Sequence, residues 1–324
     1  FIEHSKIHNF ILVLIGLVIF IQIVFKKFNK YEIKFYALNF FILFIAIFIF
    51  KNHDDFTYYH FPYTYLLTQH ELVIGIGNFG HGFRTQSSLF YLNSLFYLPY
   101  FEYFLFNLGT FLITLFSSLI LINYLFDGSL KYINKLKKNF YKYLSLLSLI
   151  FIYIFFYRLA EHGTDRSAQI LILVLFLELI FFLNLKRSDK IHLTTIYLLS
   201  GLIISLKAFY FLYLIIFVPL FFHIIKQTTL KKTVNFFLLN RFVIFLILLL
   251  LLVLISNFFN SGCLIYPVHF TCFGSLSWSI PIQEVKLMND WYELWSKAGA
   301  SPEFRVADKV EYIKNFNWVE NWFH

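Results

Sequence analysis

The sequence predicts an all-α fold, a polytopic transmembrane helix bundle of about eight spans with interfacial helices in long outer loops. Of the 324 residues, 59% are hydrophobic and only 14% are charged, which leaves too little polar surface for a water-soluble globule of this size. The apolar residues also gather in blocks that approach the roughly 20 residues needed to cross a bilayer. We therefore expect most side chains to face lipid or the interior of a bundle.

Eight segments are almost free of charged residues, and we expect each of them to cross the membrane. Several are shorter than a perpendicular span requires, so their helices should continue a few residues into the flanking sequence. In chain order the expected spans are 10–25, 35–50, 101–126, 143–157, 168–185, 191–206, 208–225 and 242–255.

The basic residues divide the connections into two sets. Most of the 27 Lys and Arg residues lie in the connections 26–34, 131–142, 186–190 and 226–241. Short loops rich in Lys and Arg stay in the cytoplasm. The first residues, the loop 51–99, the turn 158–167 and everything after Asn257 are therefore expected on the outer face. Because the net charge of +9 lies where topology requires it, no nucleic-acid partner is expected.

The composition changes once, near Asn257, where charged residues, Pro and Trp return. This change predicts a transmembrane domain, 1–256, with the outer loop 51–99, followed by an outer segment, 257–324. A helix over 284–297 would lie on the membrane surface or dock against the outer loops. Since the chain begins with Phe, it is expected to be a segment of a longer protein. Cys263 and Cys272 predict a disulfide in an oxidising compartment, and two free thiols in a reducing one.

An acidic pair gives the strongest sign of chemistry. Asp54 and Asp55 stand in the run His53 to His60, directly after the second expected span. A carboxylate there could act as a general base, ligate a metal or orient a sugar hydroxyl. Taken without any family comparison, a helix N-cap is the more frequent reason for Asp before a helix.

The same run resembles the first outer loop of the type-C superfamily of polytopic membrane glycosyltransferases. The resemblance rests on Asp55, Tyr59, His60 and Pro62, an acidic residue followed by Tyr-His and Pro, with an amphipathic stretch beyond them. The run 261–267 is similar to a Gly-Asn-Pro-x-Tyr-Pro element of bacterial members, although a Cys stands where that element has Asn. The resemblance implies that Asp54 or Asp55 is catalytic or orients a substrate, and that His60 contributes to substrate binding.

Two further places could complete a polar site on the outer face. Lys207 is the only Lys or Arg between Lys190 and Lys226, and a lone cation at membrane depth usually has a partner or a purpose. The resemblance implies that it meets the phosphate of a lipid-linked sugar, while a snorkelling residue is equally expected. The turn 158–167 concentrates ionisable side chains that could bind phosphate or sugar, or form a solvated turn with a helix cap. The candidates in this turn are Arg158, Asp165 and Arg166.

Other signals carry less weight. The run 75–80 matches a Gly-x-Gly-x-x-Gly dinucleotide pattern but lacks the required βαβ context, so we expect a turn, with Arg84 beyond it as a lipid head-group contact. No cofactor is predicted, and the histidines show no metal-ligand spacing, although a divalent metal near the acidic pair is left open. The spans hold few polar residues, Glu178 and Pro219 being the main exceptions, which favours surface chemistry over translocation.

The functional hypothesis is a glycosyltransferase of the bacterial inner membrane that serves cell-envelope glycan synthesis. As the resemblance implies, its partners would be membrane lipid, a polyprenyl-phosphate-linked sugar donor and a glycan or lipid acceptor. The alternatives are a polysaccharide or lipid transporter or flippase, a polysaccharide polymerase, and a non-catalytic membrane protein.

Overall fold

The computed structural model describes residues 2–27, 30–47, 55–126, 135–156, 159, 163–185, 189–299 and 306–323. Among these residues every regular element is a helix, and the two isolated β-bridges do not extend into strands. The predicted all-helical fold is therefore confirmed.

Five helices of the described chain are long and apolar enough to cross a membrane. Where the structure describes the expected spans, they fall on helices, but α2 (Lys30–Ile47) and α8 (Lys190–Leu206) have shorter apolar stretches. The first half of α6 (Lys135–Phe155) carries four lysines, which lowers its hydropathy. The chain is thus a helical membrane protein, and the number of eight spans remains a prediction. The five spans are Lys6–Ile23, Tyr103–Leu125, Thr164–Leu183, Ala208–Ile225 and Phe242–Ser261.

The chain forms two compact units. Unit 1 consists of Phe1–Leu72 and Gln86–Val253, and unit 2 consists of Val73–Thr85 and Leu254–His324. Helix α11 (Arg241–Ser261) belongs to both, because the division falls between Val253 and Leu254. The segment Val73–Thr85, part of the expected outer loop, is grouped with the C-terminal residues.

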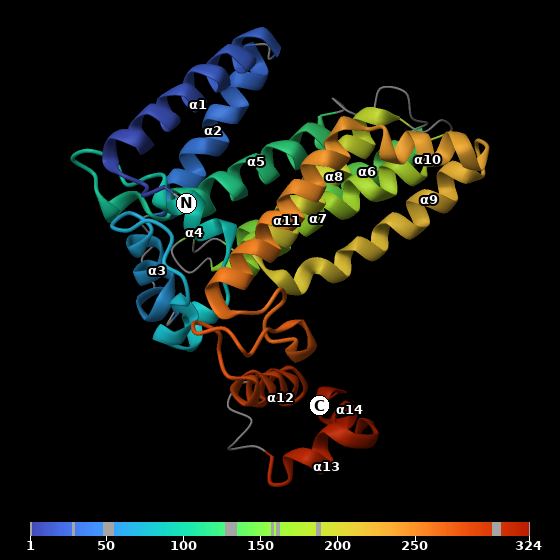
Figure 1. Cartoon of the computed structure of the whole chain (residues 1–324). Helices are drawn as coiled ribbons and strands as arrows, with labels where there is room; N and C mark the ends of the chain where they lie inside the picture. The colour runs from blue at the N-terminus through green and yellow to red at the C-terminus, as the bar shows by residue number, and fades with distance from the viewer. Residues whose placement is uncertain are drawn as a thin grey trace. The chain divides into compact units, whose positions relative to one another are not determined.

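The core of unit 1 is a bundle of four neighbouring helices (Figure 1). Helices α5 (Leu108–Leu125) and α7 (Thr164–Leu183) pack against each other, α6 packs against both, and α8 packs against α7. These helices carry apolar side chains on all sides, as is typical of helices inside a membrane. In lipid a helix satisfies its own backbone hydrogen bonds. The span after α8 consists of η6 (Ala208–Ile216) and α9 (Phe217–Ile225), and α2 packs against α5. Helix α1 (Lys6–Lys27) has only 6% of its span buried, as expected for a helix facing lipid.

The two ends of this bundle differ in character. At one end, α6, α7 and α9 meet through polar contacts: Lys137 Nζ donates to Asn184 Oδ1 (2.8 Å), and Gln227 Nε2 donates to the Leu185 carbonyl (3.4 Å). We call this the basic end, because Lys137 in the first turn of α6, Lys190 at the start of α8 and Lys226 after α9 lie there. At the other end, the hydroxyls of Ser88 and Ser205 lie 2.8 Å apart. We call this the loop end, because it carries the short helices of the loop between α2 and α5.

The loop end is built from short helices, as the sequence predicts for the loop 51–99. The first is the π-helical turn η1 (Phe56–His60), which continues into α3 (Phe61–Leu66). Later come α4 (Ser88–Ser94), whose N-cap Ser87 accepts a hydrogen bond from the backbone N–H of Leu89, and η4 (Tyr103–Leu105). At the basic end, α10 (Leu230–Leu238) precedes α11.

The N-terminal segment docks on the loop helices through His4. Its backbone N–H donates to the Leu67 carbonyl (3.0 Å), and its Nδ1 lies 2.6 Å from the Ser94 Oγ. Burial, and then the nearby charge of His8, lower the pKa of His4 below its ordinary 6.5.

This depressed pKa predicts weaker docking of the segment at acid pH. The unfolded segment binds a proton more readily than the docked one, so the stabilisation is complete well above pH 6.5 and is lost as the pH falls below it. The protection factors of the amides of residues 4–9, which correct for the slower intrinsic exchange at lower pH, should therefore fall between about pH 7.5 and pH 5.5. The His4→Gln variant should show no such fall, and an equal pH response in both proteins would contradict the assignment.

Unit 2 is a small assembly of helices around a disulfide between Cys263 and Cys272. Its elements are η2 (Ile76–Phe79), η3 (His81–Arg84), η7 (His269–Thr271), α12 (Ile282–Ala298), α13 (Lys309–Ile313), η9 (Lys314–Phe316) and α14 (Trp318–Phe323). The expected helix 284–297 lies within α12. The glycine-rich run 75–80 is a turn in which Gly75 has φ +76°, and Asn78 Nδ2 donates to the Trp278 carbonyl (2.8 Å). It is thus a packed turn without a strand before it, so the dinucleotide pattern is coincidental.

Candidate functional site

The acidic run begins with a π-helical turn. The Phe61 N–H donates to the Phe56 carbonyl, a bond from residue i to residue i+5, and Asp55 occupies the N-cap position of this turn. The Asp55 side chain makes no capping hydrogen bond there, so the capping explanation does not account for this residue. Single π-helical turns occur frequently at functional sites. Asp54 and His53 lie outside the described residues.

His60 ends the π-helical turn and lies against the start of α7. A Cβ built on Gly163 would stand 2.6 Å from His60 Cε1, so the two residues touch only because position 163 has no side chain. The imidazole is buried and held on its other sides by the rings of Tyr59 and Phe90, with centroids 4.4 Å and 5.4 Å away. The π-helical turn therefore packs directly against the N-terminus of α7.

This fit predicts that Gly163→Ala destabilises unit 1 by about 1 to 3 kcal/mol, because the added Cβ would force the buried imidazole out of its place between Tyr59 and Phe90. Thermal unfolding in detergent measures the change. Gly16→Ala is the matched control, since a Cβ at Gly16 meets no atom within 4 Å. Equal unfolding temperatures for the two variants would show that the contact between His60 and position 163 accommodates a Cβ.

Two residues after Gly163, α7 presents a carboxylate to the end of α8. The Lys207 ammonium donates to both oxygens of Asp165, at 2.7 and 2.9 Å. Lys207 has an extended backbone (φ −159°, ψ 130°) and caps the C-terminus of α8, while Asp165 lies in the first turn of α7. The helices are antiparallel neighbours, so these termini meet at the loop end. The side chains remain 37% and 52% exposed, which leaves the pair open to a ligand.

Tyr210 stands beside this pair and was missed by the sequence reasoning. It lies one turn into η6, its N–H donates to the Lys207 carbonyl (3.0 Å), and its buried hydroxyl interacts with the Asp165 carboxylate. A Tyr three residues after the lone Lys was a weak signal among 22 tyrosines. Arg166, next to Asp165, is partly buried in the same turn of α7.

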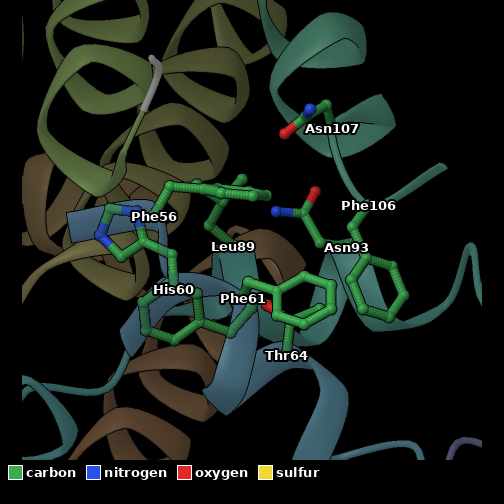
Figure 2. Close-up of a pocket in the computed structure, with 9 residues that line it drawn as sticks. Phe56, His60, Phe61, Thr64, Leu89, Asn93, Phe106 and Asn107 are labelled. Carbon is green, nitrogen blue, oxygen red and sulfur yellow. The ribbon is translucent and has the colours of Figure 1, made fainter. Parts of the chain in front are cut away.

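A small pocket lies behind the π-helical turn, between the loop helices and the start of α5 (Figure 2). Its volume is about 10 Å³, the space that one water molecule needs. The Asn93 side chain beside it accepts a hydrogen bond from the Gly109 N–H (3.0 Å). The pocket is too small for a ligand larger than water, whereas the Asp165 and Lys207 side chains are open to solvent. It is lined by Phe56, His60, Phe61, Thr64, Leu89, Phe90, Asn93, Phe106 and Asn107.

The predicted site residues thus fall into separate groups. The structure places Asp55, His60, Asp165, Arg166 and Lys207 at the loop end of unit 1. Arg84, expected to contact a lipid head group, belongs to unit 2. Arg158 lies outside the described residues.

Within unit 2, Arg84 already has protein partners. Its guanidinium donates to Glu284 Oε2 (2.8 Å) and to the Tyr266 hydroxyl (3.5 Å), and its side chain is only 15% exposed. Although burial disfavours its charge, these two partners leave the pKa of Arg84 above its ordinary value. The guanidinium therefore links two segments of unit 2. In the described residues no group of three or more His, Cys, Asp or Glu side chains is arranged to hold a metal.

Comparison with known proteins yields one match. The family described as "Domain of unknown function (DUF8201)" matches residues 1–324. Neither a curated protein nor a solved structure matches the chain.

Proposed function

We propose that this chain, which belongs to the family described as "Domain of unknown function (DUF8201)", is a membrane glycosyltransferase. The donor would be a sugar on a polyprenyl-phosphate carrier, and the reaction would take place at the outer face of a bacterial inner membrane. One observation carries the proposal: the exposed Asp165–Lys207 pair lies two residues of chain from the contact between Gly163 and His60. Residues from three distant parts of the sequence thus lie together at the loop end of the bundle.

Lys207 is suited to the phosphate of the donor. An ammonium has three N–H groups, and within the described chain Asp165 takes two of them, which leaves one for a phosphate oxygen. Asp165 holds the ammonium in one position, so little rotamer entropy is lost when the donor binds. A polyprenyl phosphate enters sideways from the bilayer, and a cation at the end of a span meets its head group at the right depth.

Asp55 is suited to the acceptor. Two residues of chain span at most about 7 Å, so Asp165 is close to the His60 ring, and Asp55 lies about one helical turn from His60. In the proposed step the Asp55 carboxylate takes the proton of the acceptor hydroxyl while that oxygen bonds to the sugar C1. The bond between C1 and the phosphate oxygen breaks, and its electron pair leaves with the polyprenyl phosphate. Lys207 stabilises the charge that develops on this leaving group.

The location of the charged pair supports surface chemistry rather than translocation. A transporter places its ionisable residues near the bilayer midplane. Lys207 ends α8 and Asp165 begins α7, so both stand at a helix terminus. Arg166 and Arg158 are candidates for a second phosphate contact, and His60 positions the π-helical turn that carries Asp55.

The direct test is an assay of sugar transfer in native membranes. Membranes that contain the chain should move a labelled sugar from a polyprenyl-phosphate carrier to an acceptor, and membranes without it should not. A panel of donors with different sugars is needed, because nothing in the site selects one. Failure with every donor, from membranes that contain the inserted chain, would overturn the proposal.

A further inference from the structure

A second polar group of unit 1 lies inside the bundle and is not used by the proposed reaction. The Glu178 carboxylate on α7 is only 6% exposed. One of its oxygens accepts a hydrogen bond from the Tyr124 hydroxyl of α5 (2.7 Å), and the other lies 2.9 Å from His192 Nδ1 of α8. Three helices therefore converge on one buried carboxylate.

The depth of this group places it near the basic end. Glu178 precedes the last residue of α7 by five positions, about 8 Å along the helix, and follows Thr164 by about 21 Å. His192 is the third residue of α8, and 21% of its side chain is exposed. The carboxylate is therefore buried within a candidate span, while the imidazole reaches from it toward the basic end.

Stability alone does not explain such a group. Removing a carboxylate from water is costly, and a buried ion pair seldom outperforms well-packed apolar residues of the same volume. Ionisable residues within spans are rare and usually serve a proton, an ion or a substrate. Here both carboxylate oxygens are satisfied and one partner is an imidazole, the side chain that exchanges protons near neutral pH.

We propose that Tyr124, Glu178 and His192 form a proton-binding site inside the bundle, reached from the basic end through His192. A proton from water joins the His192 ring at the nitrogen remote from Glu178, and the Nδ1 side shares the resulting charge with the carboxylate. Tyr124 donates to the carboxylate and fixes its orientation. The site is independent of the proposed sugar transfer.

The neighbouring titratable groups define the electrostatic setting of the site. Helix α7 contributes Glu178 itself, and its residue Phe181 packs against the His192 ring with centroids 4.5 Å apart. Helix α9 contributes His223, which packs against Phe182 and lies 2.8 Å from Gln227. Among the described residues, Tyr141 of α6 interacts with Tyr124, Asp189 at the cap of α8 interacts with His192, and Lys137 of α6 donates to Asn184 at the end of α7.

The test is an infrared pH titration of the full chain in lipid nanodiscs, without any sugar donor. The difference between the wild-type titration and that of His192→Gln should contain an imidazolium band that grows as the pH falls. Because the two groups are coupled, Glu178→Gln should move the midpoint of this band by about one pH unit or more. Tyr124→Phe should also move it, whereas His223→Gln, which alters a histidine outside the group, should not.

Two results would overturn the proposal. One is a His192 band whose midpoint is the same with and without Glu178, and the other is the absence of any His192 band in the folded wild type. Should Glu178→Gln fail to fold, the Tyr124→Phe shift still decides the question. Since no donor is present, the outcome is separate from that of the transfer assay.

Discussion

Replacing Asp55 with Asn is expected to lower sugar transfer by about 10²- to 10⁴-fold, the usual contribution of a positioned general base. The amide keeps the size of the side chain and its ability to accept a hydrogen bond, but it cannot take the proton of the acceptor hydroxyl. The measurement is the initial rate of transfer in membranes with equal amounts of inserted chain. Asp54→Asn should be assayed separately, because the acidic pair offers two carboxylates for one role.

The control for this substitution is Asp189→Asn at the basic end. Asp189 caps α8 by accepting a hydrogen bond from the Ile191 N–H (2.9 Å), and Asn caps a helix as well as Asp does, so this change removes a charge with little loss of stability and without touching the loop end. If Asp55 served only the local fold, both variants would keep their activity. Full activity in both Asp54→Asn and Asp55→Asn would remove the acidic pair from the mechanism.

The helices were predictable because a bilayer imposes a length on apolar segments. The block 168–185 had to be a span for that reason alone, and it lies within α7 apart from its last two residues. The exact ends were less predictable. Thr164 and Asp165 begin α7 four residues before the apolar block, since polar residues suit the first turn of a helix at the edge of the membrane.

The pairing of the candidate residues was harder to predict than their identity. Asp165 and Lys207 were each singled out as charges at the outer ends of spans, but their contact depends on the register of two antiparallel helices. The partner of Arg84 could not be predicted either, because Glu284 lies 200 residues further along the chain. The contact between His60 and Gly163 has no sequence signature, since a glycine in a polar turn has many explanations.

Reversing the Asp165–Lys207 pair distinguishes a structural ion pair from a phosphate site. Lys207→Met should lower transfer by about 10²- to 10³-fold, the typical effect of losing a group that stabilises developing charge. Asp165→Asn should lower transfer less, because the ammonium remains and only its positioning is lost. Their unfolding free energy should change by less than about 1 kcal/mol, because half-exposed ion pairs contribute little to stability. Initial rates of transfer and thermal unfolding in detergent measure the two effects.

The double variant Asp165→Lys with Lys207→Asp should keep the ion pair and remain inactive, because the ammonium then projects from α7 and no longer from the end of α8. Lys6→Met is the matched control: it breaks the Lys6–Glu102 pair (2.7 Å), whose side chains are 37% and 46% exposed, and should leave transfer unchanged. Wild-type activity in the reversed pair would mean that only the attraction between α7 and α8 matters. Binding of a phosphate requires the ammonium at the end of α8. An ion pair that only holds α7 and α8 together would be equally effective with the two charges exchanged.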